Sequence, residues 1–337
     1  MNLENIKLEK HMYYNPNKTF SQILEELDPS ENYDNSYVGK LDAYQRQLKR
    51  FDIKVNGKNC DYISKFYENS YSAVLFPEFV ARCIAQGMHS NSILQQIVAN
   101  TNKINTLNYQ NVQLNNLKSN ILEPVEEFQE IPETQLKPNK EFVKLIKRGC
   151  FLSASYETIE FQKIDSFSIA LKQIGRCIID SIIKDAISVL LAEKEKKDEQ
   201  STTVTSTKEG EITYEDLVNV WTQFEEFEMN TIIIHPTLLA KMANINEFKN
   251  PLSKFSFQNN GNLTTPLGAN IIKTCAAPKD SIIFLDKNFA LSQLIAKEIT
   301  VEADKLIEKQ ITRTVIYTIV GFAKMFKKAC CILKLKK

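Results

Sequence analysis

Few residues in this 337-residue chain have the type and spacing that catalysis needs, and His235 is the first to consider. It follows an apolar run and directly precedes Pro236, a position where a catalytic histidine can lie in a layered α/β fold. A nucleophilic enzyme would also need an activated serine or cysteine, and no G-x-S-x-G turn precedes His235. His11 and His89 are isolated in polar stretches. We therefore interpret His235 as the cap of a helix that begins at Pro236.

The sequence contains no pattern for a metal, phosphate or dinucleotide site. Zinc sites need cysteines and histidines at short, defined spacings, and neither a C-x-x-C pair nor a Cys/His cluster occurs. The glycine-rich phosphate loops are also missing from the sequence. The acidic cluster of Glu225, Glu226 and Glu228 is typical of a solvated face rather than of an acid–base pair. We predict no catalytic, cofactor-binding or metal-binding residue, no cofactor, and a protein that is not an enzyme.

Cysteine usage indicates reduced thiols. The chain has seven cysteines, an odd number without C-x-x-C spacing. Cys177 falls in a predicted helix, and the adjacent Cys330 and Cys331 fall in a strand-like tail, where small buried apolar residues are expected. We predict structural thiols rather than a disulfide framework.

The overall charge gives no general attraction to nucleic acid or to membranes. The 42 basic and 41 acidic residues leave a net charge of +1. The N-terminus lacks the apolar core of a signal peptide. A basic C-terminal stretch, with Phe322 and Phe326 among its lysines, allows non-specific contact with nucleic-acid phosphates; the preferred interpretation is a strand whose outer face is solvated by lysine. Its lysines are Lys324, Lys327, Lys328, Lys334, Lys336 and Lys337.

A long helix, predicted for residues 165–197, is the element around which the rest must be arranged. Its apolar residues recur at the 3.6-residue helix period. The main stripe consists of Phe167, Leu171, Ile174, Ile178, Ile182, Ala186 and Val189. A second stripe consists of Ile169, Ile179, Ile183, Ile187 and Leu190. A helix with two apolar stripes must be covered on two sides, by its own domain and by a neighbouring subunit.

The polar residues of this helix set its beginning and its environment. Asp165 or Ser166 is expected to cap its N-terminus. Charged side chains interrupt the helix often enough to exclude a membrane span, because each would be costly at the centre of a bilayer. These side chains are Arg176, Asp180, Lys184 and Asp185.

The residues before this helix indicate an N-terminal arm followed by a β-hairpin. Residues 1–70 are polar and broken by proline and glycine, with short helices expected at 20–27 and 41–51. Because such a segment would be poorly ordered alone, we expect an extended arm that lies across something else. Strands at 142–146 and 150–154, with a return near 147–150, predict a hairpin that needs support from a partner.

The residues after the helix indicate a compact α/β segment and returning strands. A charged and then Ser/Thr-rich linker at 193–210 is the clearest internal boundary. Beyond it, Thr213 is placed to cap a helix, and Met229–Ile234 is an apolar, β-branched run typical of a buried strand. The last strands, over 313–331, are expected to break at Gly321.

This order of parts resembles the major capsid protein of tailed bacteriophages, whose fold is shared with encapsulin shells. Ile212–Leu217 is similar to the opening helix of that family's axial domain, and Thr231–Met242 is similar to its strand followed by a helix. Thr265–Ile271 resembles the short motif that leads into a strand in this family, but the second proline of that motif is absent here. Further similar stretches are Leu75–Phe79, Ser281–Asp286 and Ile311–Ala323. The resemblance covers residues 71–335.

The resemblance implies an α+β fold, the tailed-phage major capsid fold. It has an N-terminal arm, an extended β-hairpin loop, a peripheral domain with a long spine helix, and an axial α/β domain. The implied segments are the N-terminal arm 1–70, the start of the peripheral domain 71–121, the extended hairpin loop 122–164, the spine helix 165–200, the axial domain 201–296, and the returning strands of the peripheral domain 297–337.

The resemblance also implies a function. It implies a coat protein that self-assembles into pentamers and hexamers of an icosahedral shell around phage double-stranded DNA. The implied partners are other copies of the chain, a scaffolding protein, a portal and a decoration protein, with non-specific contact to packaged DNA and no membrane. The implied location is the virion capsid, assembled in the host bacterial cytoplasm.

Two other functions stay open at this point. An encapsulin-like compartment shell around a cargo protein shares the fold, but the long N-terminal arm speaks against it. An α/β enzyme would be indicated by a pocket in which titratable groups converge around His235. Some capsid relatives carry a cleaved scaffolding segment at the N-terminus. The segment here is short and broken by proline and glycine, so we expect an arm and a separate scaffolding protein.

Overall fold

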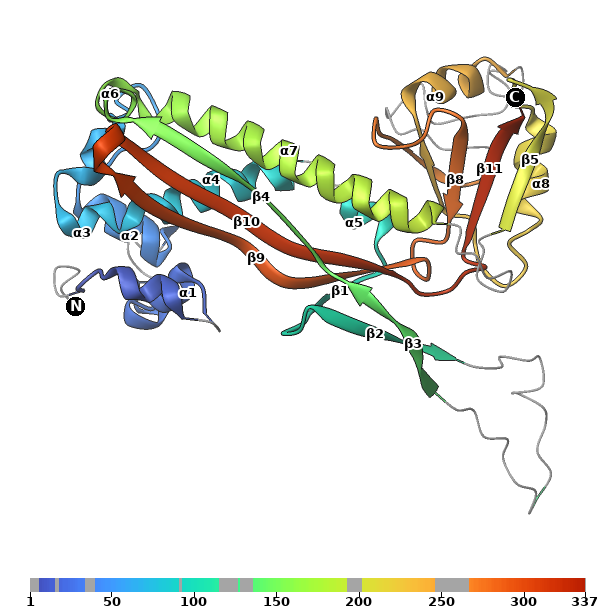
Figure 1. The fold of residues 1–337 in the computed structure, drawn as a ribbon, viewed down its shortest axis with the longest axis horizontal. Coiled ribbons are helices and arrows are strands. Elements are labelled where there is room, and N and C mark those ends of the chain that lie inside the picture. Colours follow the sequence, from blue (N-terminus) through green and yellow to red (C-terminus); the bar gives the residue numbers. More distant parts are fainter. Residues whose placement is uncertain are drawn as a thin grey trace. The chain divides into compact units, whose positions relative to one another are not determined.

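The fold is known from a computed structural model (Figure 1). The structure describes residues 6–15, 18–33, 40–90, 93–114, 127, 136–192, 202–245 and 267–336. The chain divides into two compact units. The first unit comprises Met1–Asn91, Arg148–Ile179 and Glu298–Thr318; the second comprises Ser92–Lys147, Asp180–Lys297 and Ile319–Lys337. The long elements α7, β9 and β10 contribute residues to both units.

The N-terminal residues of the first unit are folded and helical, so the expectation of an extended arm is wrong. We call the described residues from 6 to 67 the N-terminal layer. Its elements are η2 (Lys10–Tyr14), α1 (Phe20–Leu27), η3 (Ser30–Tyr33), α2 (Ala43–Arg50) and η5 (Ile63–Tyr67). Capping boxes at Thr19 and Asp42 begin α1 and α2. The layer orders because its short helices are amphipathic and bury apolar residues such as Phe20 and Leu24.

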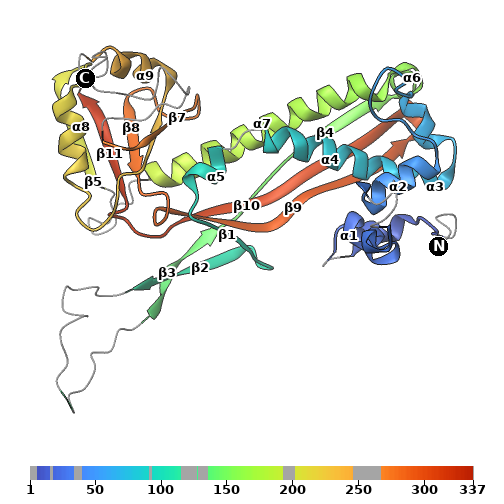
Figure 2. The same ribbon diagram turned by 180° about the vertical axis from the view of Figure 1, so that it is seen from behind.

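Two helices cross at a pair of glycines in the first unit. α3 (Ser70–Ala73) leads into α4 (Leu75–His89), which has Pro77 in its first turn and runs through Gly87 instead of ending there. A methyl group on Gly87 would overlap the backbone of Lys172, and one on Gly175 would overlap the carbonyl oxygen of Ile84. The two backbones therefore approach more closely than any side chain would allow. Figure 2 shows α4 running beside α7.

The long helix α7 spans Ile164–Leu191, close to the predicted range. Asp165 lies in its first turn instead of capping it, and Ala192 is no longer helical; residues 193–197 of the predicted helix lie outside the described residues. Both predicted stripes are largely buried, including Ile178 at 8% exposed, but Ile169 is 65% exposed. Among the helices that the structure describes, none is long and apolar enough to cross a bilayer.

A four-stranded sheet has the strand order β1–β9–β10–β4. Its strands are β1 (Asn100–Lys103), β4 (Ile146–Ser155), β9 (Leu291–Leu306) and β10 (Ile311–Lys324). β1 follows α5 (Ile93–Ile97) and pairs with β9 in parallel. β10 runs straight through Gly321, where a break was predicted. A Cβ there would lie 3.0 Å from the Leu145 side chain. Glycine is therefore needed at this position because β10 passes close to Leu145 within the second unit, and not because the chain turns.

The hairpin is built from different strands than the sequence predicts. β2 (Asn108–Leu114) pairs antiparallel with β3 (Leu136–Lys144). The predicted strand 150–154 belongs instead to β4, which lies beside β10 and leads to α6 (Tyr156–Phe161). The return predicted near 147–150 is wrong, because Gly149 continues the strand and lets it lie directly against the backbone of Ile316. The residues that connect β2 and β3 are mostly outside the described part.

A five-stranded sheet with the order β5–β11–β8–β6–β7 forms the core of the second unit. Its strands are β5 (Thr202–Glu209), β6 (Thr231–Ile234), β7 (Asn270–Lys273), β8 (Ser281–Leu285) and β11 (Cys330–Lys336). β8 pairs antiparallel with β6 and β11, whereas β5 and β7 add in parallel at the two edges. β5 lies within the predicted linker; its β-branched threonines suit a strand, and β11 supplies the partner.

Two helices cover one face of this sheet (Figure 1). They are α8 (Tyr214–Trp221) and α9 (Pro236–Ala243). Alternate residues of the strands, such as Ile232, Ile234 and Phe284, pack with Leu217 of α8 and Leu238 of α9 in one apolar cluster. The sequence predicts a loop at 246–262, and the resemblance to the capsid family implies an acidic turn at Asn246–Glu247; both lie outside the described residues.

Candidate functional site

His235 caps α9, as the sequence predicts. Its ring Nδ1 accepts a hydrogen bond from the backbone N–H of Thr237 at 3.2 Å and lies 2.8 Å from the Thr237 hydroxyl. The residue is 9% exposed, directly after the buried strand β6. The ring nitrogen that faces the protein is therefore used in a structural contact that satisfies one of the free N–H groups of the helix start.

The other candidate groups for chemistry do not converge. In the part of the chain that the structure describes, no group of three or more His, Cys, Asp or Glu side chains could hold a metal ion. His11 lies 3.0 Å from Glu9 at an exposed position. In the acidic cluster, Glu226 pairs with Lys328 at 3.3 Å, and all three glutamates are exposed. The interpretation of this cluster as a solvated face agrees with its geometry.

None of the seven cysteines, all of which the structure describes, is in a disulfide, and their exposure is mixed. Cys330 and Cys331 are buried in β11, as expected, but Cys177 is exposed on α7, which corrects the prediction for that residue. Burial raises the pKa of Cys83 to about 11 and that of Cys331 to about 12. These two thiols therefore stay protonated near neutral pH and are poor nucleophiles.

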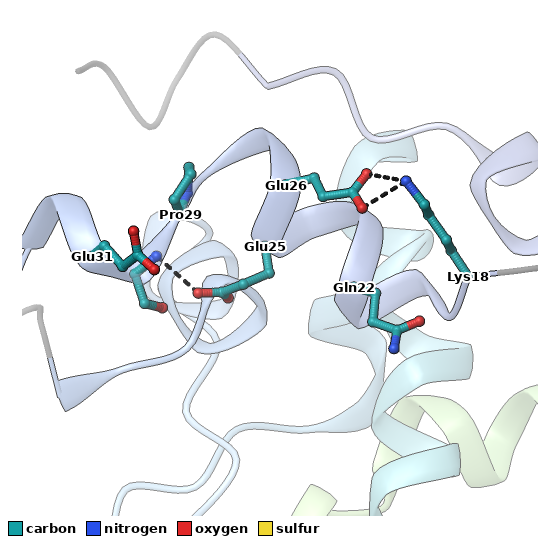
Figure 3. A pocket seen from close by; sticks show the side chains of 7 residues that line it. Lys18, Gln22, Glu25, Glu26, Pro29 and Glu31 are labelled. Atoms are coloured by element: carbon teal, nitrogen blue, oxygen red, sulfur yellow. Dashed lines mark hydrogen bonds and ion pairs between the residues drawn. The ribbon is translucent and has the colours of Figure 1, made fainter.

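A hollow of 440 Å³ lies in the N-terminal layer (Figure 3). It is lined by Lys18, Gln22, Glu25, Glu26, Pro29, Ser30 and Glu31. The Glu25 carboxylate accepts hydrogen bonds from the backbone N–H groups of Ser30 at 2.8 Å and Ala43 at 3.0 Å. Burial alone would raise the pKa of Glu25, but these hydrogen bonds outweigh it and hold the pKa below its usual value. Glu26 pairs with Lys18 at 2.6 Å. The charged groups of this hollow mainly hold the layer together.

A second hollow, of 200 Å³, lies within the second unit and has a mainly apolar lining. Its residues are Lys144, Ile146, Asp185, Ser188, Val189, Ala192, Val320, Gly321 and Phe322. Neither hollow includes His235 or a cysteine. The pocket around His235 that would indicate an enzyme is therefore neither of these two hollows.

The basic C-terminal stretch is mostly part of the sheets. Phe322 is buried, and the Lys324 ammonium donates to the carbonyl oxygen of Leu190 at 2.9 Å. Lys334 and Lys336 are exposed on β11. This arrangement agrees with the preferred interpretation, a strand whose outer face carries solvated lysines.

Exposed apolar side chains mark candidate interaction surfaces. In the second unit, Leu107, Phe142 and Ile146 lie at the ends of β2, β3 and β4 and are 61%, 63% and 43% exposed. We call these three residues the hairpin-base patch after their place in the chain; because Phe142 pairs with Gln110, Leu107 and Phe142 fall on opposite faces of the hairpin. In the first unit, Phe161 and Ile307 are 71% and 78% exposed. Contiguous apolar surface is typical of regions that another protein covers, and these exposed side chains are candidates for such a region.

Comparisons with known proteins identify the fold. No protein-family model matches the sequence, and no curated protein matches it. Solved structures do match. The capsid of a native GTA particle has a TM-score of 0.57 at 12% identity and covers 75% of this chain and 91% of that chain. The capsid of the cyanophage P-SCSP1u has a TM-score of 0.53 at 12% identity and covers 72% of this chain and 88% of that chain.

An encapsulin is similar to the same extent. The holo-SrpI encapsulin complex from Synechococcus elongatus PCC 7942 has a TM-score of 0.52 at 10% identity and covers 72% of this chain and 86% of that chain. The α+β fold implied by the sequence resemblance, the tailed-phage major capsid fold, is therefore confirmed. At these identities the likeness concerns the fold, which phage capsids and encapsulins share.

Proposed function

We propose that this chain is a coat protein that self-assembles into pentamers and hexamers of an icosahedral capsid around phage double-stranded DNA. The observation that carries the proposal is the capsid fold over about three-quarters of the chain. The chain acts as a structural subunit and not as an enzyme. It has the location that this role requires: the virion capsid, assembled in the host bacterial cytoplasm.

The chemistry of the surface supports this role. Shell subunits associate through many modest contacts, whose effects multiply in a closed assembly. The hairpin of β2 and β3 has two strands, and two strands alone are marginally stable in water. The hairpin-base patch exposes apolar area beside it. Both features are stabilised if a neighbouring copy packs against them.

The proposed partners follow from the same role. They are other copies of the chain, a scaffolding protein, a portal and a decoration protein. Contact with packaged DNA is non-specific, through exposed lysines such as Lys334 and Lys336, because a net charge of +1 provides no strong attraction overall.

A second candidate is an encapsulin-like compartment around a cargo protein, supported by the similarity to the SrpI encapsulin. The argument against it is the long N-terminal segment before α4, which is folded into the N-terminal layer here. The two candidates differ in what the shell encloses.

Electron microscopy of the purified protein, expressed alone and with its neighbouring genes, tests the proposal. We expect closed shells, tubes or ring-shaped capsomers. Nuclease-protected DNA inside shells made with the neighbouring genes would support the phage capsid, whereas a co-purifying protein without protected DNA would support the compartment. A monodisperse monomer under both conditions would contradict both candidates.

A further inference from the structure

Arg82 of α4 makes several of the contacts that attach the N-terminal layer to α4. Arg82 of α4 donates to Asp42 at 2.6 Å, to Glu78 at 3.0 Å and to the Ser21 hydroxyl at 2.5 Å. Its guanidinium also lies 4.2 Å from the centre of the Tyr44 ring. Ser21 belongs to α1, whereas Asp42 and Tyr44 belong to the start of α2. One side chain therefore holds both helices of the layer on α4.

Backbone contacts reinforce this attachment. The Tyr13 hydroxyl donates to the carbonyl oxygen of Val74 at 2.7 Å, and the Tyr44 hydroxyl donates to that of Leu75 at 3.1 Å. Both acceptors lie at the start of α4, and Val74 and Leu75 are themselves buried. Burial raises the pKa of both tyrosines well above the usual value, so both hydroxyls stay protonated and able to donate.

The layer is itself rigid, because a second arginine is buried inside it. Arg46 is 0% exposed; its Nε donates to Asp28 at 2.6 Å, and its Nη1 donates to Ser30 at 3.0 Å and to the carbonyl oxygen of Leu41 at 2.5 Å. A buried charge with its hydrogen bonds satisfied is costly to disrupt. Separating the folded layer from α4 should therefore cost less free energy than unfolding the layer itself.

The connection between the layer and α4 is short. η5 ends at Tyr67 and α3 begins at Ser70, so two residues separate them, and the three intervals from Tyr67 to Ser70 span at most about 11 Å when fully extended. Ile63 and Phe66 of η5 are 0% exposed, and the Ile63 N–H donates to the carbonyl oxygen of Gln162 at 3.1 Å. The intact layer cannot reach a neighbouring subunit unless η5 leaves its buried position.

We propose that the N-terminal layer stays docked on α4 of its own chain before and after assembly. Arg82 is the residue whose contacts hold it there, and we call it the latch. The layer is neither removed by proteolysis nor exchanged between subunits. The assembly part of this inference rests on the proposed shell function; the docking part does not.

Cross-linking tests the docking. Ser21→Cys and Glu78→Cys are combined, because these two side chains lie 2.5 Å apart. The double variant keeps the contact of Arg82 with Asp42 and the hydrogen bonds of Tyr13 and Tyr44, so the layer should stay docked in it. In the same background the three cysteines that are not buried, Cys150, Cys177 and Cys275, are serine. A short bismaleimide cross-linker is added to unassembled protein and to assembled particles, and linked peptides are mapped by mass spectrometry. We expect a link within one chain in both samples. A covalent dimer joined through these positions, or particles that lack the N-terminal peptides, would overturn the proposal.

A matched pair controls for distance. Gln86 is exposed on α4, eight residues after Glu78 and therefore about 12 Å farther along the helix axis. We expect Ser21→Cys with Gln86→Cys to give at least tenfold less of the short cross-link. Equal yields would mean that the layer is not held at one place on α4, which contradicts docking.

The latch itself is tested by limited proteolysis with intact-mass detection. Arg82→Ala should raise the rate of cleavage within the layer about tenfold, because local opening exposes the layer to protease. Arg176→Ala, which removes an exposed arginine of α7 that contacts Ser90, should leave the rate unchanged. An unchanged rate in Arg82→Ala would show that Arg82 is not the latch. A chain that forms no shells at all would refute the proposed function and the assembly part of this inference, while the cross-link in unassembled protein would still decide docking.

Discussion

The ring of His235 is used to cap the helix α9, which explains why a histidine after a buried strand need not be catalytic. The Nδ1 atom accepts from the Thr237 N–H, the role that asparagine or aspartate plays at many helix starts. Pro236 follows at the first helical position, where the missing N–H costs nothing. Neither residue needs a substrate to explain its presence.

Substitution of His235 should therefore affect stability through the cap. We expect His235→Ala to lower the free energy of unfolding by about 1 kcal/mol, and His235→Asn to lower it by less, because asparagine can accept from the same N–H. Denaturant unfolding of the three proteins measures the difference. If the asparagine variant lost as much as the alanine variant, the cap would not be the role of this side chain.

Asp216 is a buried carboxylate that ties α8 to β5. It accepts from the hydroxyl of Thr207 at 2.7 Å, from the N–H of Thr207 at 2.9 Å and from the N–H of Thr213 at 2.9 Å. Burial alone would raise the pKa of Asp216, but these hydrogen bonds favour the ionised form and lower it overall. The folded state thus binds a proton at Asp216 less readily than the unfolded state.

Asp216 should make the second unit less stable in acid. Because its pKa is lower in the folded state, its contribution is complete above the usual aspartate pKa of about 4 and is lost as the pH falls through the lower folded value. We expect Asp216→Asn to be less stable than the wild type at pH 7, with the difference shrinking below about pH 4. Thermal unfolding at a series of pH values measures this; a constant difference would contradict the mechanism.

At the scale of elements, the crossing of α4 and α7 depends on Gly87 and Gly175. Glycine lowers helix stability relative to alanine by about 1 kcal/mol, so its presence in two helix interiors needs a reason. The reason is contact between backbones, because a methyl group at either glycine would overlap backbone atoms of the other helix.

Gly175→Ala should therefore destabilise the first unit even though alanine favours helices. We expect a net loss of about 1–3 kcal/mol, since the helices must move apart to admit the methyl group. Gln173→Ala, at an exposed position of the same helix, is the matched control and should be neutral or slightly stabilising. Equal stability of the two variants in urea unfolding would show that the helices cross less closely than the structure indicates.

At the scale of the whole molecule, the proposed assembly should depend on the hairpin-base patch. Phe142 and Ile146 are exposed, so replacing both with serine should leave the unfolding of the single chain nearly unchanged. Assembly should fall at least tenfold, because the apolar area is no longer available to a neighbour.

Light scattering of assembly and thermal unfolding of the dissociated chain separate these two effects. Gln110→Ser is the matched control, because Gln110 is exposed on β2 directly opposite Phe142. We expect it to assemble like the wild type. Normal assembly of the Phe142→Ser and Ile146→Ser double variant would exclude the patch from the contacts of the shell.

Much of this molecule was predictable from the sequence because it depends on neighbours along the chain. The 3.6-residue period located α7 and most of its buried residues, and Thr213 and His235 were identified as caps from the residues that follow them. The run of β-branched residues at 231–234 was identified as a buried strand for the same reason. The order of such elements was enough to recognise the capsid fold.

The tertiary structure decided what depends on partners distant in the sequence. β5 lies in a segment that resembles a linker, and β11, more than a hundred residues later, makes it a strand. β3 pairs with β2 before it rather than with β4 after it. The polar N-terminal segment is folded because α4 offers Arg82 and a buried surface to pack on. Cys177 is exposed because the packing around α7 leaves its part of the helix uncovered, which periodicity alone does not reveal.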